Sequence, residues 1–398
     1  MLTRRDFLQA SSVVALAPSV PSLLRRTARA AEGGNNERLL VVVQLSGGND
    51  GINTVVPFAD DGYKRHRKEL RLPGDRLLPL NDSLALHPSM QGAMDLLEEG
   101  RLAIVQGVGY PNPSRSHPVS MATWQSARLD REEHRSYGWI GRGLDAAPNL
   151  RPNVAGSVLV GDEPTPLTLR ARKTASASLR SIEEMLSFNE SGRSLAAATG
   201  DTNDLSAFVQ RQSLDAYATA DLLRSLARPE GQTASSYPST ALAGRLKLIA
   251  QLIKADLGSR VYYATQPGYD THSQQLPRHS RLLRQLAGAL KAFVGDLHTA
   301  GLGERVLVLC FSEFGRRVAE NASIGTDHGT AGPVLLAGSP VQPGVHGQTP
   351  ALADLAGDED PEYTVDFRSV YASILERWLG IDSTLALAAE FPQLPLLR

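Results

Sequence analysis

Cysteine is almost absent from this sequence, and several other features are scarce. The single thiol, Cys310, cannot form a disulfide within the chain, so the fold must depend on its core, with metal as a further support. The net charge of −1 excludes the strongly basic surface of nucleic-acid-binding proteins, so no nucleic-acid partner is expected. No apolar run is long and unbroken enough to span a bilayer of about 30 Å, which excludes a transmembrane segment.

The first thirty residues have the pattern of an export signal. Arg4-Arg5 precedes Phe7 and Leu8, an apolar run covers residues 10–24, and small residues at 28 and 30 frame a cleavage site. This predicts a twin-arginine signal peptide over residues 1–30, with the twin-arginine export machinery as a partner and a periplasmic or secreted location. Because that route carries folded proteins, often with a metal already bound, the signal also points to metal chemistry.

Six short apolar runs bounded by turn residues predict buried strands. They are Leu39–Leu45, Leu102–Gln106, Ser157–Val160, Val261–Thr265, Val306–Phe311 and Val334–Ala337. Their near-continuous apolar character is typical of parallel strands covered on both faces. Apolar residues at helical spacing over 282–297 and 367–378, the latter with Asp366 as N-cap, predict covering helices. The fold class is therefore α/β, with a mostly parallel central sheet flanked by helices.

The middle of the chain has a different character. From about residue 175 to 258 we expect no strand, and apolar spacing over 208–223 and 246–253 predicts helices between polar stretches. The expected organisation is one α/β domain over residues 31–398 with a helical insertion at about 175–258. That insertion is placed to shape a substrate site.

Ligands in parallel sheets bind beyond the carboxyl ends of the strands, so polar residues at those ends are candidates. Asp50 follows the first strand in a Gly-Gly-Asn-Asp-Gly loop, where it is either a cation ligand or a turn residue. Arg115 and Ser116 precede a predicted helix after the second strand. Arginine suits an anionic ester, whereas the serine is a nucleophile or only an N-cap.

Three further loops carry ligand types. Asp270 and His272 follow the strand at 261–265, and a carboxylate and an imidazole at this spacing can converge on one ion. Glu313 follows the strand at 306–311, where it is a ligand, a general base or a helix cap. His328 lies in a glycine-rich loop, a poor place for a core histidine. Together these residues predict a metal site.

These motifs carry a family resemblance. Its landmarks are Val41–Gly51, Leu86–Pro88, Ser114–His117, Asp270–His272, Phe311–Arg316 and Thr326–Thr330. On them the chain resembles the DUF1501 family, a twin-arginine-exported, sulfatase-like branch of the alkaline phosphatase superfamily. The resemblance implies a mixed α/β sandwich that hydrolyses phosphate or sulfate esters, with a small anionic, sulfated or phosphorylated compound as substrate.

The resemblance also implies roles for residues. Ser116 corresponds to the nucleophile, and Arg115 would neutralise the anionic ester. Asp270, His272 and His328 would hold a divalent metal with an open position for substrate. We expect one ion, with zinc as the first choice and calcium or manganese as alternatives.

The pattern of a second metal site is incomplete. Glu313 and Asp50 would be partial second-site ligands or bases, but Phe314 stands where the superfamily has a histidine. Pro111 stands where a formylglycine sulfatase has its cysteine, so that enzyme class is not expected.

Two alternatives remain open. The chain could be a non-catalytic periplasmic binding or assembly protein that keeps the fold and has lost the chemistry. It could also be a metal-free serine hydrolase that uses Ser116 with His328 and Asp327, although no Gly-x-Ser-x-Gly elbow is present.

Overall fold

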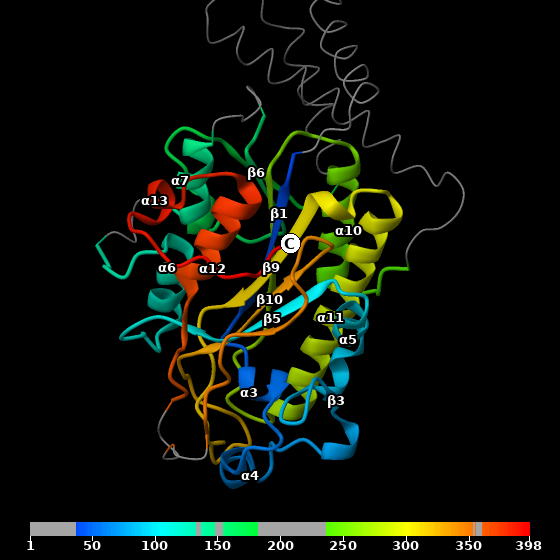
Figure 1. The fold of residues 1–398 in the computed structure, drawn as a ribbon, viewed down its shortest axis with the longest axis vertical. Helices are drawn as coiled ribbons and strands as arrows, with labels where there is room; N and C mark the ends of the chain where they lie inside the picture. Colours follow the sequence, from blue (N-terminus) through cyan, green and yellow to red (C-terminus); the bar gives the residue numbers. More distant parts are fainter. Residues whose placement is uncertain (1–36, 133–136, 148–153, 182–235, 353–354, 356–359) are drawn as a thin grey trace, which may run out of the picture. The chain divides into compact units, whose positions relative to one another are not determined.

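The architecture is that of a computed structural model, which describes residues 37–132, 137–147, 154–181, 236–352, 355 and 360–398. The predicted signal peptide lies outside these ranges. The described chain is built on a nine-stranded sheet with strand order β11-β5-β10-β9-β1-β8-β6-β7, and β12 also pairs with β5 (Figure 1). The strands are β1 (Leu39–Ser46), β5 (Leu102–Gly109), β6 (Ser157–Val160), β7 (Ser176–Leu179), β8 (Val261–Pro267), β9 (Val306–Ser312), β10 (Gly332–Ala337), β11 (Gly344–His346) and β12 (Val365–Asp366).

The sheet is mostly parallel, as the apolar runs predict. β1 pairs in parallel with β8 and β9, and only β10 is antiparallel to its neighbours, β9 and β5. Because β10 is antiparallel to both β9 and β5, β5 runs in the same direction as β9, β1 and β8. All six predicted strands are confirmed, with ends that differ from the prediction by at most three residues.

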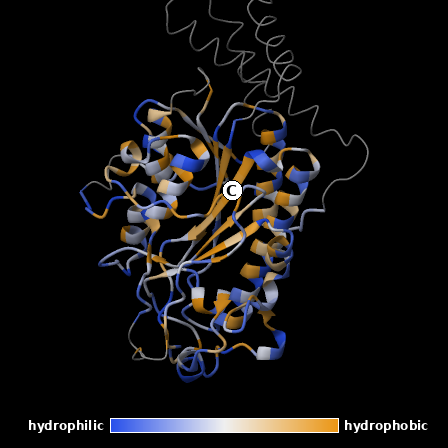
Figure 2. Ribbon diagram, in the orientation of Figure 1, coloured by the Kyte–Doolittle hydropathy of each residue, from blue (hydrophilic) through white to orange (hydrophobic). Residues whose placement is uncertain are grey.

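Helices cover both faces of the sheet (Figure 1). Leu39, Val41 and Val43 of β1 share one apolar cluster with α5, α10 and α11, whereas Leu40 and Val42 share another with α6, α7, α12 and α13. The inner strands are therefore mostly apolar on both faces (Figure 2). The covering helices are α5 (Gln91–Glu98), α6 (His117–Ser126), α7 (Trp139–Ala146), α10 (Ala241–Lys254), α11 (Gln275–Thr299), α12 (Phe367–Ser373) and α13 (Ser383–Leu387).

Of the four helices predicted from apolar spacing, those over 246–253, 282–297 and 367–378 are present as α10, α11 and α12, and the one over 208–223 lies outside the described residues. α11 buries the leucines at 282, 283, 286 and 290 together with Phe293 and Leu297. α12 begins after Asp366, whose side chain accepts a hydrogen bond from the backbone N–H of Arg368, as an N-cap does. The helical path continues through the wider turns of η6 (Ile374–Leu379), which bury Trp378.

Shorter elements complete the described chain. A small three-stranded sheet has the order β2-β4-β3. The remaining elements are α3 (Gly51–Thr54), β2 (Val55–Val56), α4 (Asp61–His66), η1 (Gly74–Arg76), β3 (Leu78–Pro79), β4 (Ala85–Leu86), η2 (Pro88–Met90), η4 (Leu167–Leu169) and η5 (Gly303–Arg305). No described helix is both long and apolar enough to cross a membrane.

The stretch expected to lack strands contains one. Ser176–Leu179 forms β7 and pairs in parallel with β6 at the end of the central sheet. Three of its four side chains are exposed, so it lacks the apolar signature of an inner strand. α10, at the other end of the stretch, packs on the sheet and on α11. Residues 182–235 lie outside the described residues, so the helical insertion there stays a prediction.

The loop after β1 is held by a buried ion pair. Asp50 and Arg67 are fully buried, and the guanidinium binds both carboxylate oxygens, at 2.6 and 3.2 Å. The carboxylate also accepts hydrogen bonds from the Asn53 backbone and the Gln275 amide. Burial opposes ionisation, but the charge and hydrogen bonds of Arg67 outweigh it and lower the pKa of Asp50 to about 2. The oxygens of Asp50 are thus occupied by a structural ion pair rather than free for a metal.

Replacing Asp50 by Asn should therefore destabilise the fold strongly. The Arg67 charge would stay buried without its partner, and we expect a loss of about 3–5 kcal/mol in the free energy of unfolding, measured by urea denaturation. Because the pKa of Asp50 is depressed, the ion pair stabilises the native protein fully above about pH 4, and this contribution is lost as the pH falls toward 2.

The exposed pair between Asp61 and Lys64, at 3.2 Å, provides the control. Asp61→Asn should cost less than about 1 kcal/mol, because solvent already screens that pair. Losses of equal size in the two variants would contradict a stabilising role for the buried pair.

Candidate functional site

The predicted site residues converge because of the strand directions. β1, β5, β8 and β9 all end at one edge of the sheet, and β10, which runs the opposite way, begins there. The loop after β8 carries Asp270 and His272, the loop after β9 carries Glu313, and the loop before β10 carries His328. The single antiparallel strand is what brings His328 to the same edge as the others.

Asp270 lies at the centre of a cluster of histidines. Its Oδ1 is 3.0 Å from Nε2 of His272, 3.3 Å from Nε2 of His328 and 3.5 Å from Nε2 of His117. The Nε2 atoms of His272 and His328 are 2.9 Å apart. The structure therefore brings Asp270, His272 and His328 together and adds His117, the first residue of α6.

The other ring nitrogen of each histidine faces an acceptor. Nδ1 of His328 lies 2.7 Å from the backbone carbonyl oxygen of Arg115, which can only accept, so this nitrogen carries the hydrogen. Nδ1 of His117 lies 2.8 Å from Glu313, and Nδ1 of His272 lies 3.2 Å from Asp327. With the hydrogens assigned to these nitrogens, the neutral rings turn three Nε2 lone pairs toward Asp270.

This donor set fits a metal ion. Ligand atoms arranged around zinc at about 2.0–2.1 Å lie roughly 3.3 Å from one another, and four of the six separations are 2.9, 3.0, 3.3 and 3.5 Å. The ligand atoms of His117, Asp270 and His328 all lie within 4.8 Å of one another, and His272 adjoins this set through Asp270 and His328. Nε2 of His117 is buried and has no hydrogen-bond partner among the described residues. Imidazoles held through Nδ1 by carboxylates or carbonyls are the usual support of metal-binding histidines.

The cluster is open on one side. The side chains of Asp270 and His272 are 45% and 44% exposed, whereas that of His328 is 23% exposed. An ion held between them could be reached by a ligand from solvent.

Arg316 sets the charge of the central carboxylate. Its side chain is fully buried, and one guanidinium nitrogen lies 2.8 Å from Oδ1 of Asp270. Burial of Asp270 works against ionisation, but the hydrogen bond and charge of Arg316 outweigh it and lower the pKa to about 2. Asp270 is therefore an anion at any pH at which the histidines are neutral.

The pKa values of two of the histidines are shifted in opposite directions. The hydrogen bond that His117 donates to Glu313 raises the pKa of His117, whereas burial lowers the pKa of His328. These shifts follow from their neighbours, a buried carboxylate for His117 and the apolar ring of Phe314 for His328, whose ring centres are 4.8 Å apart.

Sequence reasoning missed His117 as a candidate ligand because it considered only Arg115 and Ser116 in this loop. Its position at the start of the helix after β5 was the available signal, since this end of β5 reaches the same edge as β8 and β9. The ring of Phe314 packs against both His117 and His328, with ring centres 4.9 and 4.8 Å apart. Phe314 thus supports the cluster with its ring and supplies no ligand.

Glu313 joins the cluster through His117, whose Nδ1 lies 2.8 Å from its Oε1. It is 1% exposed and accepts hydrogen bonds from His117, from the backbone of Gly47 at 2.9 Å and from the hydroxyl of Ser312 at 3.0 Å. Oε1 is therefore occupied by two donors of the protein, whereas Oε2 shares the single hydroxyl hydrogen of Ser312 with the carbonyl oxygen of Leu45. Its place beside the cluster fits the fixing of the His117 ring better than metal ligation or proton transfer to a substrate.

Arg115 and Ser116 lie next to the cluster with different surroundings. The guanidinium of Arg115 forms an ion pair with Asp360, so it is already engaged, while its carbonyl orients His328. Ser116 is exposed at the N-cap of α6, yet its side chain makes no capping hydrogen bond. The side chain of Ser116 therefore does not act as a helix cap.

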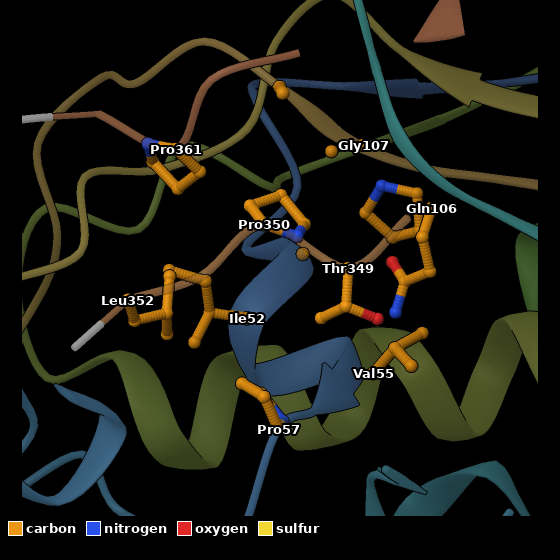
Figure 3. A pocket seen from close by; sticks show the side chains of 13 residues that line it. Ile52, Val55, Pro57, Gln106, Gly107, Thr349, Pro350, Leu352 and Pro361 are labelled. Carbon is orange, nitrogen blue, oxygen red and sulfur yellow. The ribbon is translucent and has the colours of Figure 1, made fainter. Parts of the chain in front are cut away.

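A small apolar recess lies elsewhere in the described chain. Its walls include Ile52, Val55, Pro350, Leu352 and Pro361 (Figure 3). None of the residues that line it belongs to the histidine cluster. The recess is therefore a surface separate from the histidine cluster.

Glu313→Gln tests the support of His117. The amide can present a donor to Nδ1 and weakens the hold on the imidazole, so we expect metal affinity to fall about 10–100-fold. Competition with a chromogenic chelator would measure it. Glu320→Gln is the control, since Glu320 accepts from the backbone N–H groups of Glu69 and Leu70. Unchanged affinity in Glu313→Gln would show that the fold alone orients His117.

Solved structures with similar chain traces have low sequence identity. The C-terminal periplasmic domain of EcEptC from Escherichia coli matches with a TM-score of 0.42 and 9% identity, covering 91% of each chain. Ps i-CgsB in complex with k-i-k-neocarrahexaose matches with 0.40 and 9%, covering 90% of this chain and 75% of that one. The PsFucS1 sulfatase from Pseudoalteromonas sp. matches with 0.37 and 12%, covering 85% and 72%.

No curated protein matches the sequence. A family model described as "Protein of unknown function (DUF1501)" matches residues 37–390, which is nearly all of the chain after the predicted signal peptide. The match includes every residue of the histidine cluster and all the landmark motifs of the sequence. The chain therefore belongs to the DUF1501 family.

Proposed function

We propose that this protein is an exported, metal-assisted hydrolase of phosphate or sulfate esters that binds one divalent ion, with zinc as the first choice and calcium or manganese as alternatives. One observation carries the proposal: three imidazole Nε2 atoms and Asp270 Oδ1 converge, while acceptors hold the opposite nitrogen of every ring. Such a set of unprotonated donors is costly without a cation and suits zinc best, because nitrogen ligands dominate.

The chain's own residues would prepare the site for an anionic ester. A bound divalent ion would polarise the ester and lower the pKa of an attacking hydroxyl. Asp270 supplies a fixed negative charge, and Arg316 keeps it ionised from the buried side. The exposed sides of Asp270 and His272 leave room for the substrate.

The proposed nucleophile is Ser116. Its hydroxyl is not used as a helix cap, and it directly precedes His117 in the chain. The proposed role of Arg115 as a clamp for the ester has less support, because Asp360 already binds its guanidinium. The Oε1 atom of Glu313 already has Gly47 and His117 as partners, which disfavours this carboxylate as a general base.

A single ion is favoured over two. A second ion would need Asp50 and Glu313 as ligands, but Arg67 binds Asp50 and His117 binds Glu313. Phe314 offers no ligand atom. Arg316 already brings a positive charge to the inner side of Asp270, where a second cation would meet repulsion.

The metal-free serine hydrolase finds no support in the contacts of the described residues. Asp327 contacts His272 rather than His328, and Nδ1 of His328 faces a carbonyl oxygen. A serine, histidine and aspartate in series would need His328 between the other two. The non-catalytic binding protein remains the second candidate function, favoured by the engagement of Arg115 with Asp360, which leaves the expected ester clamp occupied.

Export by the twin-arginine route is part of the proposal and rests on the sequence of residues 1–30. That route would deliver the folded protein to the periplasm or the exterior with its metal in place.

His328→Ala should abolish both metal binding and turnover, because it removes one Nε2 ligand and opens the contact to His272. The measurement is elemental analysis of the mature protein, purified after native export without chelators, together with hydrolysis of 4-nitrophenyl phosphate and 4-nitrophenyl sulfate. About one equivalent of metal in the wild type is expected. Full metal content in the variant would remove His328 from the site.

Ser116→Ala separates the two candidate functions. If Ser116 attacks the ester, the variant should keep its metal and lose at least about 100-fold in kcat. Ser323→Ala is the control, since Ser323 is an exposed serine in the loop between β9 and β10. Metal without turnover in the wild type, on either ester, would favour the binding protein; undiminished turnover in Ser116→Ala would exclude the serine as nucleophile.

A further inference from the structure

The loop that joins β9 to the histidine cluster carries two successive arginines with opposite surroundings. Arg316 is fully buried and donates to the carbonyl oxygens of Gly48 and Thr326 at 2.7 Å each, as well as to Asp270. It is therefore saturated with acceptors and cannot turn toward a substrate. Arg317, the next residue, has no hydrogen-bond or ion-pair partner for its guanidinium within the part of the chain that the structure describes, and its Nε is buried without one.

The backbone places Arg317 beside the cluster. Residues 316 and 328 form an isolated antiparallel bridge, and the backbone N–H of Arg317 donates to the carbonyl oxygen of Asp327 at 3.1 Å. Residues opposite each other in such a pair point to the same side with Cβ atoms about 4.5–5.5 Å apart. Arg317 therefore stands next to Asp327, whose carboxylate is 3.2 Å from Nδ1 of His272.

Asp327 forms no hydrogen bond or ion pair with the Arg317 guanidinium in the described part of the chain, although the nearby charge of Arg317 helps to lower the pKa of Asp327. Its Oδ1 is engaged by His272 and by the side-chain amide of Asn321, at 3.2 and 3.1 Å, and no ion pair forms with Arg317. Leaving a partly buried guanidinium without an acceptor is unfavourable, so its retention at the rim of a metal site calls for an external anion. Arg115, the other arginine beside the cluster, already has Asp360 as its anion.

Resting on the function proposed above, we infer that Arg317 binds a second anionic group of the substrate, beyond His272 and Asp327, and thereby selects esters that carry at least two anionic groups. The ester to be cleaved would face the open side of Asp270 and His272, and the second sulfate or phosphate would face the guanidinium. The chemical class is a multiply sulfated or phosphorylated compound.

The test compares one anionic group with two. The mature, zinc-loaded protein is titrated calorimetrically with a monosulfated disaccharide and with the disulfated form of the same sugar. We expect Arg317→Gln to weaken the disulfated probe about tenfold, since it removes a charge-assisted hydrogen bond, and to leave the monosulfated probe and the zinc content unchanged. Arg317→Lys should recover part of the loss, because charge is kept without the fork.

Arg281→Gln is the matched control, an exposed arginine on α11. Equal weakening in Arg281→Gln and Arg317→Gln would overturn the inference, because the effect would then reflect net charge. Equal weakening of both probes by Arg317→Gln would also overturn it, as would a wild-type protein that does not prefer the disulfated probe. Because the readout is binding, a wild type that discriminates the probes without hydrolysing any ester would sink the proposed function alone.

Discussion

The buried guanidinium of Arg316 is the contact on which the rest of the site depends. It donates to backbone carbonyls of Gly47, Gly48, Tyr269 and Thr326 and to the side chain of Asp270, and so ties together the loops after β1, β8 and β9 and the loop before β10. A buried cation is tolerated only when its donors are satisfied, so the loops must keep these positions for the charge to be stable. The ion pair with Asp270 helps to stabilise the buried charge of Arg316 and also fixes the position of the Asp270 side chain.

The close approach of these loops explains a sequence feature that otherwise looks like an ordinary turn. Gly47 and Gly48 have φ of +122° and +75°. A Cβ at Gly47 would lie 2.4 Å from the Asp270 backbone nitrogen, and one at Gly48 would lie 2.3 Å from the ring of Phe314. The loop after β1 must therefore be bare at both positions, because it packs directly behind the residues that bear the ligands.

The fold could be predicted from the sequence because buried parallel strands have a strong local signature, whereas much of the site could not. The sequence did not predict β7, because an edge strand with exposed side chains lacks that apolar signature. Asp270, His272 and His328 were found because strand ends are where ligands gather, but the roles of Asp50 and Glu313 depend on partners far away in the chain. An aspartate that meets Arg67 and one that meets a metal look the same in a sequence.

The balance of charge around the histidine cluster favours the binding of a cation. Three imidazole lone pairs and a carboxylate at 2.9–3.5 Å repel one another, and Arg316 offsets only the charge of Asp270 from the inner side. The outer side remains electron-rich, held in place by Glu313, Asp327 and the Arg115 carbonyl. A cation bound there would convert this repulsion into attraction and would stabilise the folded chain in proportion to the logarithm of its concentration over Kd.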